Sequence, residues 1–191
     1  MKKLLGLALL ATASCATVPA APAREFFTDL SAHCGKAYEG RIVSPPAAAD
    51  ASFAGKRLVM HVRECSADTI RIPFHVEGDR SRTWVITRTA TGYRLKHDHR
   101  HEDGSEDKVT QYGGDSITPR TAQRQEFPAD AFTKELLIRE NNVAGANNIW
   151  AVEVIPGRIY GYELRRPGRF FRVDFDLTRP IAPPPPPWGS L

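Results

Sequence analysis

Three histidines at alternate positions mark the segment of this chain that is best suited to chemistry. His97, His99 and His101 lie in the sequence KHDHRHEDGSED. Because side chains of an extended strand alternate between its two faces, these imidazoles are predicted to share one face with Tyr93. The residues between them are charged and would face solvent. The histidine face is therefore expected to point into the protein or toward the mouth of a barrel.

Imidazoles two residues apart on a strand can bind one metal ion. Their Cβ atoms are about 6.5 to 7 Å apart, so two rings can converge on zinc or copper with bonds of about 2.0 to 2.1 Å. His75, His61 or a carboxylate of the following turn would complete the ligand set. The sequence thus predicts a site for a small ligand or a divalent transition metal. The residues assigned to this site are His97, His99, His101, Tyr93 and His75.

The same imidazoles allow two other interpretations. A histidine beside Glu102 or Asp103 would titrate near neutrality and serve acid-base catalysis in a hydrolase or isomerase. Alternatively, a polar cavity can use a row of imidazoles to hydrogen-bond to tyrosine, arginine and backbone groups without binding anything. No catalytic residue is assigned, because the chain has no Gly-x-Ser-x-Gly elbow, phosphate-binding loop or dinucleotide fingerprint.

The first residues of the chain indicate export. Two lysines precede an apolar stretch, residues 4–13, that is too short to span a bilayer. Cys15 follows small residues in a pattern that resembles the lipobox of bacterial lipoproteins, in which the cysteine is lipidated and becomes the N-terminus. The alternative is cleavage after Ala23, which would release a soluble protein that begins at Arg24.

The three cysteines of the chain favour the lipoprotein. In an oxidising compartment an unpaired cysteine needs an explanation, and lipidation of Cys15 leaves Cys34 and Cys65 as a pair. A disulfide between them would stabilise the fold by about 3 to 4 kcal/mol in the chain-entropy model. We therefore expect a lipoprotein on the periplasmic side of the cell envelope, in contact with the membrane through its lipid anchor.

One folded domain is predicted between two segments of unusual composition. Residues 1–15 are assigned to the signal peptide and residues 16–24 to a tether. A run of prolines near the C-terminus predicts that residues 180–191 form a disordered tail. Residues 25–179 then remain for a single domain with one hydrophobic core. Basic and acidic residues nearly balance in the mature chain, which gives no reason to expect nucleic-acid binding.

The hydrophobic period changes once near the start of this domain. Residues 25–34 have the spacing of a short amphipathic helix, with Gly35 placed to end it. Beyond that point apolar residues recur at every second position, as in strands. Strands are predicted at residues 56–65, 70–76, 82–89, 93–102, 108–112, 121–127, 148–155, 158–166 and 169–177.

A second helix is predicted to interrupt the strands from residue 128 to about residue 141. Asp130 is its expected N-cap, and Phe132, Leu136 and Leu137 are its expected apolar stripe. Many short antiparallel strands favour a sheet that closes on itself, because closure removes open edges. We predict a mainly β, lipocalin-like (calycin-type) antiparallel barrel of about ten strands with an N-terminal helix and one inserted helix. A β-sandwich is the competing topology.

Two further groups of residues have open interpretations. Aromatic residues such as Trp84, Trp150 and Tyr162 can line a pocket for an apolar ligand or fill the core. The sequence RRPGR at residues 165–169 is predicted to be a solvated hairpin tip, with contact to an anionic surface as the alternative.

Several motifs together resemble an uncharacterised family of exported bacterial proteins. They are CGKAYEG (34–40), RIPFHVEGDRSRTWV (71–85), LKHDHRHEDGSED (95–107), YGG (112–114) and YELRRPGRFFRVDFDL (162–177). The resemblance implies export and no particular activity. The expected function is a non-enzymatic envelope lipoprotein that binds a small ligand or metal. A structural or interaction protein with a filled barrel is the alternative, and a hydrolase or isomerase is the least supported class.

Overall fold

The computed structural model describes residues 22–117 and 121–190. Its helices are α1 (Pro22–Ser31), α2 (Ala131–Arg139) and the short 3₁₀ helices η1 (Ala48–Asp50) and η2 (Val143–Asn147). Its strands are β1 (Ala37–Ile42), β2 (Leu58–His61), β3 (Glu64–Cys65), β4 (Thr69–Val76), β5 (Asp79–Arg88), β6 (Tyr93–His99), β7 (Tyr112–Asp115), β8 (Arg124–Pro128), β9 (Ile149–Ile155), β10 (Ile159–Arg166) and β11 (Arg169–Ile181). Within these ranges no helix combines the length and apolar character needed to cross a membrane.

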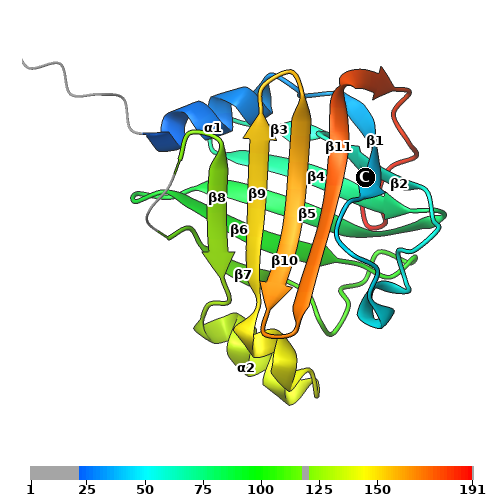
Figure 1. The fold of residues 1–191 in the computed structure, drawn as a ribbon, viewed down its shortest axis with the longest axis vertical. Coiled ribbons are helices and arrows are strands. Elements are labelled where there is room, and N and C mark those ends of the chain that lie inside the picture. The colour runs from blue at the N-terminus through cyan, green and yellow to red at the C-terminus, as the bar shows by residue number, and fades with distance from the viewer. Residues whose placement is uncertain (1–21, 118–120, 191) are drawn as a thin grey trace, which may run out of the picture.

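The strands form one antiparallel sheet that curls into a nearly closed barrel. Their order is β7-β6-β5-β4-β2-β1-β11-β10-β9-β8, and β3 pairs with β4 beside this path. Figure 1 shows β8 to β11 as one wall and β4 to β7 as the wall behind it, with α1 and α2 at opposite ends. The predicted mainly β antiparallel barrel with an N-terminal and an inserted helix is thus confirmed.

The barrel closes where β7 meets β8, a junction that we call the seam. Two backbone hydrogen bonds cross it, from Ile117 N to Glu126 O and from Asp130 N to Gly113 O, each 3.0 Å long. Gly113 also lies against β6, because a Cβ atom on it would be 1.9 Å from Leu95 O. Its φ of 150° belongs to a region that favours glycine. Only a residue without a side chain therefore fits at this point of the seam.

Helix α2 is attached directly to the seam. The predicted N-cap is confirmed, since the Asp130 side chain accepts a hydrogen bond from Thr133 N. The buried Thr133 hydroxyl accepts from Gly113 N and donates to Gly113 O, at 2.7 and 2.8 Å. Leu136 is buried as predicted, but Phe132 is 51% exposed. The helix turns Thr133 rather than Phe132 toward the barrel, because one residue along a helix rotates the side chain by about 100°.

The α1 end of the barrel is filled by aromatic side chains. Phe26 and Phe27 point into the barrel, and the Tyr93 ring packs on both, with centroids 5.2 and 5.9 Å away. Just after this helix, Cys34 and Cys65 form the predicted disulfide, which joins residues 31 positions apart. The aromatic side chains therefore fill this end of the barrel, and the disulfide ties the segment after α1 to β3.

Several predicted boundaries differ from the structure. Helix α1 begins at Pro22, inside the predicted tether, whose residues 16–21 lie outside the described ones together with the signal peptide. Strand β6 ends at His99 rather than 102, and residues 108–111 form a loop instead of a strand. Strand β1 was not predicted, because its sequence AYEGRI shows little alternation. It is held by pairing on both sides, with β2 and β11.

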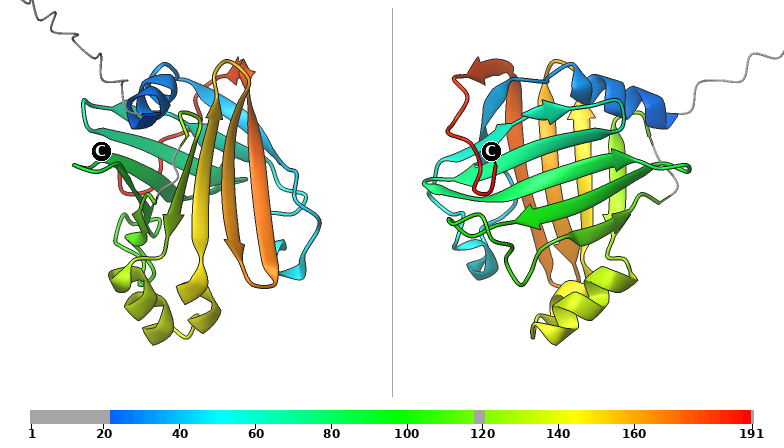
Figure 2. Two further views of the ribbon diagram at one scale, coloured as in Figure 1. Left: turned by 60° about the vertical axis from the view of Figure 1, so that its left-hand side comes forward. Right: turned by 180° about the vertical axis from the view of Figure 1, so that it is seen from behind.

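The prediction of a disordered tail from residue 180 is also corrected. Strand β11 continues to Ile181, and residues 182–190 cross the outer face of the β4–β5 hairpin (Figure 2, right). There Arg80 Nη1 donates to Pro186 O at 3.0 Å, and Trp188 N donates to Arg80 O at 3.1 Å. The extended proline run therefore lies along the sheet, and the folded domain is wider than residues 25–179 at both ends.

The close packing at the seam predicts that one methyl group added at Gly113 strongly destabilises the fold. Gly113→Ala should lower the free energy of unfolding by about 3 kcal/mol or more, because the new Cβ would overlap Leu95 O. Gly157→Ala is the matched control, since Gly157 also has positive φ but no atom within 4 Å of the added Cβ. It should cost only about 1 to 2 kcal/mol. Urea unfolding of both variants measures the difference, and equal losses would contradict this account of the seam.

Candidate functional site

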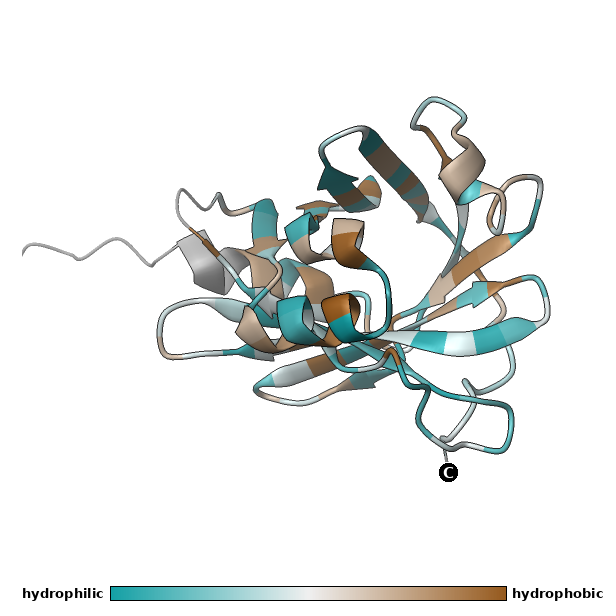
Figure 3. Ribbon diagram, turned by 90° about the horizontal axis from the view of Figure 1, so that it is seen from below, coloured by the Kyte–Doolittle hydropathy of each residue, from teal (hydrophilic) through white to brown (hydrophobic). Residues whose placement is uncertain are grey.

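A cavity of about 300 Å³ lies at the α2 end of the barrel. Figure 3 views the molecule from this end. The cavity is partly open to solvent and is lined by four kinds of side chain: neutral polar groups, arginines, aliphatic groups and aromatic rings. The aromatic rings that line it belong to Phe53, Phe74, Trp84, Tyr112, Tyr162 and Phe171.

Strand alternation determines which side chains reach the cavity. Every second residue of a strand faces inward, so β6 contributes His97 and His99 while Lys96 and Asp98 point outward. The same rule brings Trp84 in from β5, together with alternate residues of β10 and β11. The cavity therefore collects side chains from strands that are far apart in the sequence.

Stacked rings form one wall of the cavity. Trp84 stacks on Tyr162 with centroids 4.3 Å apart and an interplanar angle of 22°, and on Phe74 at 4.7 Å and 14°. Phe53, in the loop after η1, packs against Phe171 with centroids 5.0 Å apart. Such surfaces bind flat apolar groups well, because both dispersion and the hydrophobic effect favour the contact.

His97 is a neutral, fully hydrogen-bonded group in this wall. Its Nδ1 lies 3.1 Å from the carbonyl oxygen of Tyr112, which can only accept, so Nδ1 carries the hydrogen. Its Nε2 lies 2.8 Å from the Tyr162 hydroxyl and therefore accepts from it. Burial, followed by the charge of nearby His99, lowers the pKa of His97 to about 3. Both ring nitrogens are in use, which leaves no lone pair for a metal.

His99 continues this neutral network toward the cavity mouth. Its Nε2 is 3.1 Å from the hydroxyl of Tyr112, whose ring stacks on His97 at 4.4 Å. Burial, followed by the charge of Arg82, lowers the pKa of His99 to about 4. Burial also raises the pKa of Tyr112. The arrangement corresponds to the hydrogen-bonded row of imidazoles weighed above against metal binding.

His101 does not join the other two imidazoles. Its side chain is 55% exposed, and its Nε2 is 4.0 Å from a carboxylate oxygen of Asp107. The chain leaves the sheet after His99 because Arg100 binds the carbonyl of Gly104 and pairs with Glu106 across a bend. Among the described residues no group of three or more His, Cys, Asp or Glu side chains is placed to hold a metal. The structure therefore does not bring the three predicted imidazole ligands together.

The other predicted site residues lie elsewhere. Tyr93 belongs to the aromatic plug at the α1 end. His75 sits on the outer face of β4, where the proline run covers it, and it is 4% exposed. Glu102 and Asp103, proposed partners for acid-base catalysis, lie in the exposed loop after β6 and do not line the cavity. Of the five predicted site residues, the structure brings only His97 and His99 together in this cavity.

Three arginines of the cavity were missed by sequence analysis: Arg82, Arg166 and Arg169. The alternation of inward and outward side chains along the strands would have identified two of them. Arg166 is four residues after the inward-facing Tyr162, and Arg169 is two residues before the inward-facing Phe171. The interpretation of residues 165–169 as a solvated hairpin tip obscured this pattern. Strand alternation continues to the ends of β10 and β11, so the two arginines point into the mouth of the barrel.

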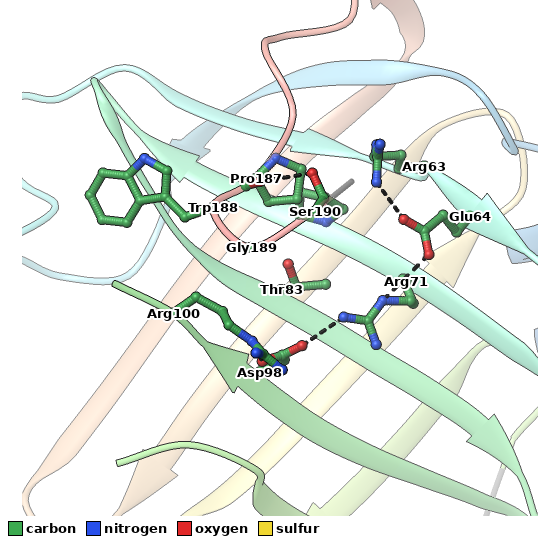
Figure 4. A pocket seen from close by; sticks show the side chains of 11 residues that line it. Arg63, Glu64, Arg71, Thr83, Asp98, Arg100, Pro187, Trp188, Gly189 and Ser190 are labelled. Atoms are coloured by element: carbon green, nitrogen blue, oxygen red, sulfur yellow. Dashed lines mark hydrogen bonds and ion pairs between the residues drawn. The ribbon is translucent and has the colours of Figure 1, made fainter. Parts of the chain in front are cut away.

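A second hollow, of about 360 Å³, lies on the outer face of the barrel under residues 187–190 of the tail (Figure 4). Its charged side chains are bound to one another. Asp98 accepts from Arg71 at 2.6 Å and from Arg100 at 2.9 Å, and Arg63 pairs with Glu64. Charges that already satisfy each other gain little from a ligand. The aromatic cavity is therefore the better candidate for a functional site.

Comparison of the chain with protein-family models, with curated proteins and with solved structures found no match. The resemblance to an uncharacterised family of exported proteins stays a prediction.

The buried histidines predict loss of stability in acid. The unfolded chain binds a proton on His97 below its ordinary pKa of 6.5, whereas the folded chain does so only near pH 3. Stability is therefore complete above pH 6.5 and falls as the pH drops toward 3, and by pH 5 the loss due to His97 is about 2 kcal/mol. The variant His97→Gln should lose about 2 kcal/mol less than the wild type between pH 7 and pH 5.

Urea unfolding at the two pH values measures this difference. His101→Gln is the control, because its ring lies in solvent, and its loss between the two pH values should equal that of the wild type. Titrating carboxylates contribute equally to all three proteins and cancel in the comparison. An unchanged loss in His97→Gln would show that His97 is not held neutral by burial.

Proposed function

We propose that this chain is a non-enzymatic binding protein of the cell envelope whose barrel takes a small, largely apolar ligand in the cavity at the α2 end. The observation that carries this proposal is the wall of stacked rings around an accessible cavity of about 300 Å³. That volume is at the small end of the range for small-molecule sites. A barrel that served only as a scaffold would gain stability by filling this space with side chains, as it does at the α1 end.

The state of the histidines supports binding rather than proton transfer. A general base needs a pKa near the working pH and a free lone pair. His97 and His99 have pKa values of about 3 and 4, and Nε2 of His97 already accepts a hydrogen bond from Tyr162. Their role in the proposal is to provide neutral polar edges in an otherwise aromatic wall.

The proposed location on the periplasmic side of the envelope is supported by two independent features. The first residues have the pattern of an export signal, and Cys15 follows small residues as in a lipobox. The disulfide between Cys34 and Cys65 is of the kind that persists in oxidising compartments. Together they favour a lipoprotein that is anchored to the membrane by Cys15.

Blocking the mouth of the cavity tests the binding proposal. The neutral fluorescent probe N-phenyl-1-naphthylamine should bind the purified domain saturably, with increased emission because its rings leave water. Ser52 is exposed and lines the cavity, so Ser52→Trp should place an indole in the mouth and weaken binding by about tenfold or more.

Ala54→Trp is the matched control, because Ala54 is also exposed, lies two residues away and does not line the cavity. Its affinity for the probe should equal that of the wild type. Absence of saturable binding, or equal binding by both tryptophan variants, would contradict the proposed function.

Lipidation is tested at the mature N-terminus. Mass spectrometry of the protein produced with its own first residues in a bacterial host should find a lipid-modified Cys15 as the first residue. Cys15→Ser should move the protein from the membrane fraction to the soluble fraction. An unmodified protein that begins at Arg24 would contradict the anchor, and it would also lack the first residues of α1.

A further inference from the structure

The wall of the cavity contains positive charge but no negative charge. Arg82, Arg166 and Arg169 line it, and none of the Asp and Glu residues that the structure describes does so. Behind the wall, Asp79 pairs with Arg82, and Asp50 pairs with Arg169. These two carboxylates neutralise two of the three guanidinium groups.

Arg166 carries the guanidinium group that neither of these two carboxylates neutralises. In the part of the chain that the structure describes, its hydrogen-bond partner is the neutral side-chain oxygen of Asn148, 3.0 Å from Nη1. Burial lowers the pKa of Arg166, Arg169 lowers it further, and Asp50 offsets this only in part. One positive charge therefore remains at the mouth of the cavity.

The position of Arg166 adds to this imbalance. It is the direct cross-strand partner of Arg169, on either side of the tight β10–β11 turn. Like charges at directly opposite positions destabilise an antiparallel pair. Arg169 also has a buried Nε atom that donates to no described residue. The two arginines thus cost the free protein stability, while Arg169 keeps a donor that the described residues do not use.

Two adjacent guanidinium groups form a strong site for a carboxylate. Each presents N–H groups in one plane, and a carboxylate can accept from both through its two oxygens. A monoanion would balance the single positive charge. The stacked rings of Phe74, Trp84 and Tyr162 line the same cavity and offer apolar contacts to the rest of the ligand.

We propose that the cavity selects an aromatic monocarboxylate, with the carboxylate held between Arg166 and Arg169 and the ring packed against the stacked wall. This inference rests on the proposed function, because it names the ligand class of the same cavity. A flat ring matches the stacked side chains and the volume of about 300 Å³ better than a long acyl chain does.

The test compares an anionic probe with a neutral probe of the same ring. 2-Naphthoate and 2-naphthamide have the same ring and nearly the same shape, and each competes with N-phenyl-1-naphthylamine for the cavity. The naphthoate should bind about tenfold or more tighter than the amide, because hydrogen bonds to charged groups are stronger than those to neutral ones. Octanoate should compete less well than 2-naphthoate.

The variant Arg166→Gln assigns the difference to one side chain. It should remove most of the preference, so that the naphthoate and the amide bind the variant with similar affinities. Arg158→Gln is the matched control, because it removes the same charge from an exposed residue in the β9–β10 turn. It should keep the preference for the naphthoate, which excludes an effect of net charge alone.

The outcomes separate the two proposals. Equal binding of both naphthalene probes to the wild type, or a preference that survives Arg166→Gln, overturns the carboxylate site and leaves the binding barrel in place. Tighter binding of octanoate overturns the aromatic assignment. If neither the fluorescent probe nor any competitor binds, the proposed function fails and the carboxylate site fails with it.

Discussion

The arrangement of the whole molecule depends on closure of the barrel at the seam between β7 and β8. Curling the sheet brings its first and last strands together, and a gap there would leave unpaired backbone groups at both edges. Gly113 allows β7 to approach β6, and Gly114 allows it to approach β8, since a Cβ atom on Gly114 would lie 1.9 Å from Pro128 O. Thr133 then attaches α2 to the same backbone. The helix at the mouth of the cavity is thus placed by the closure itself.

Charged side chains are arranged differently on the outer and inner faces of the barrel. On the outer face of β8 to β11, buried charges are paired in a network: Arg172 binds Glu153, Glu163 and Asp174, and Arg124 also binds Glu163. Gly161 makes room for Arg172, because a Cβ atom there would lie 2.6 Å from its Nη2. Such paired charges restrict the register of neighbouring strands. Inside the barrel His97 and His99 are neutral, and at the mouth Arg166 has no carboxylate partner among the described residues.

Much of the fold follows from periodicity in the sequence, and its failures have identifiable causes. The period of two predicted the inward positions of His97 and His99, because long strands in a closed sheet leave no alternative orientation. The same rule failed at His101, where the contacts of Arg100 with Gly104 and Glu106 end the strand. These contacts join residues across a loop, and no local pattern encodes them. The disulfide was predicted by counting cysteines rather than by geometry.

The missed arginines show a different limit. Composition predicts that a basic segment around Pro-Gly is a solvated turn, and this rule outweighed the alternation that assigns Arg166 and Arg169 to the inward face. The tail was missed for a related reason, since a proline run has no internal hydrogen bonds and predicts disorder unless a partner surface exists. Arg80 provides that partner through its side chain and its carbonyl group. In both cases contacts in the folded protein, which composition does not show, determine where the segment lies.

The two ends of the barrel differ in how their side chains are packed, and this difference supports a binding role for the α2 end. The α1 end holds the aromatic plug of Phe26, Phe27 and Tyr93 together with the disulfide. The α2 end instead has a cavity and two like charges on opposite strands. Natural sequences break local rules mainly where function requires it, because selection removes unfavourable contacts that serve no purpose. The pair Arg166 and Arg169 is such an exception, and a bound anion would turn its cost into binding free energy.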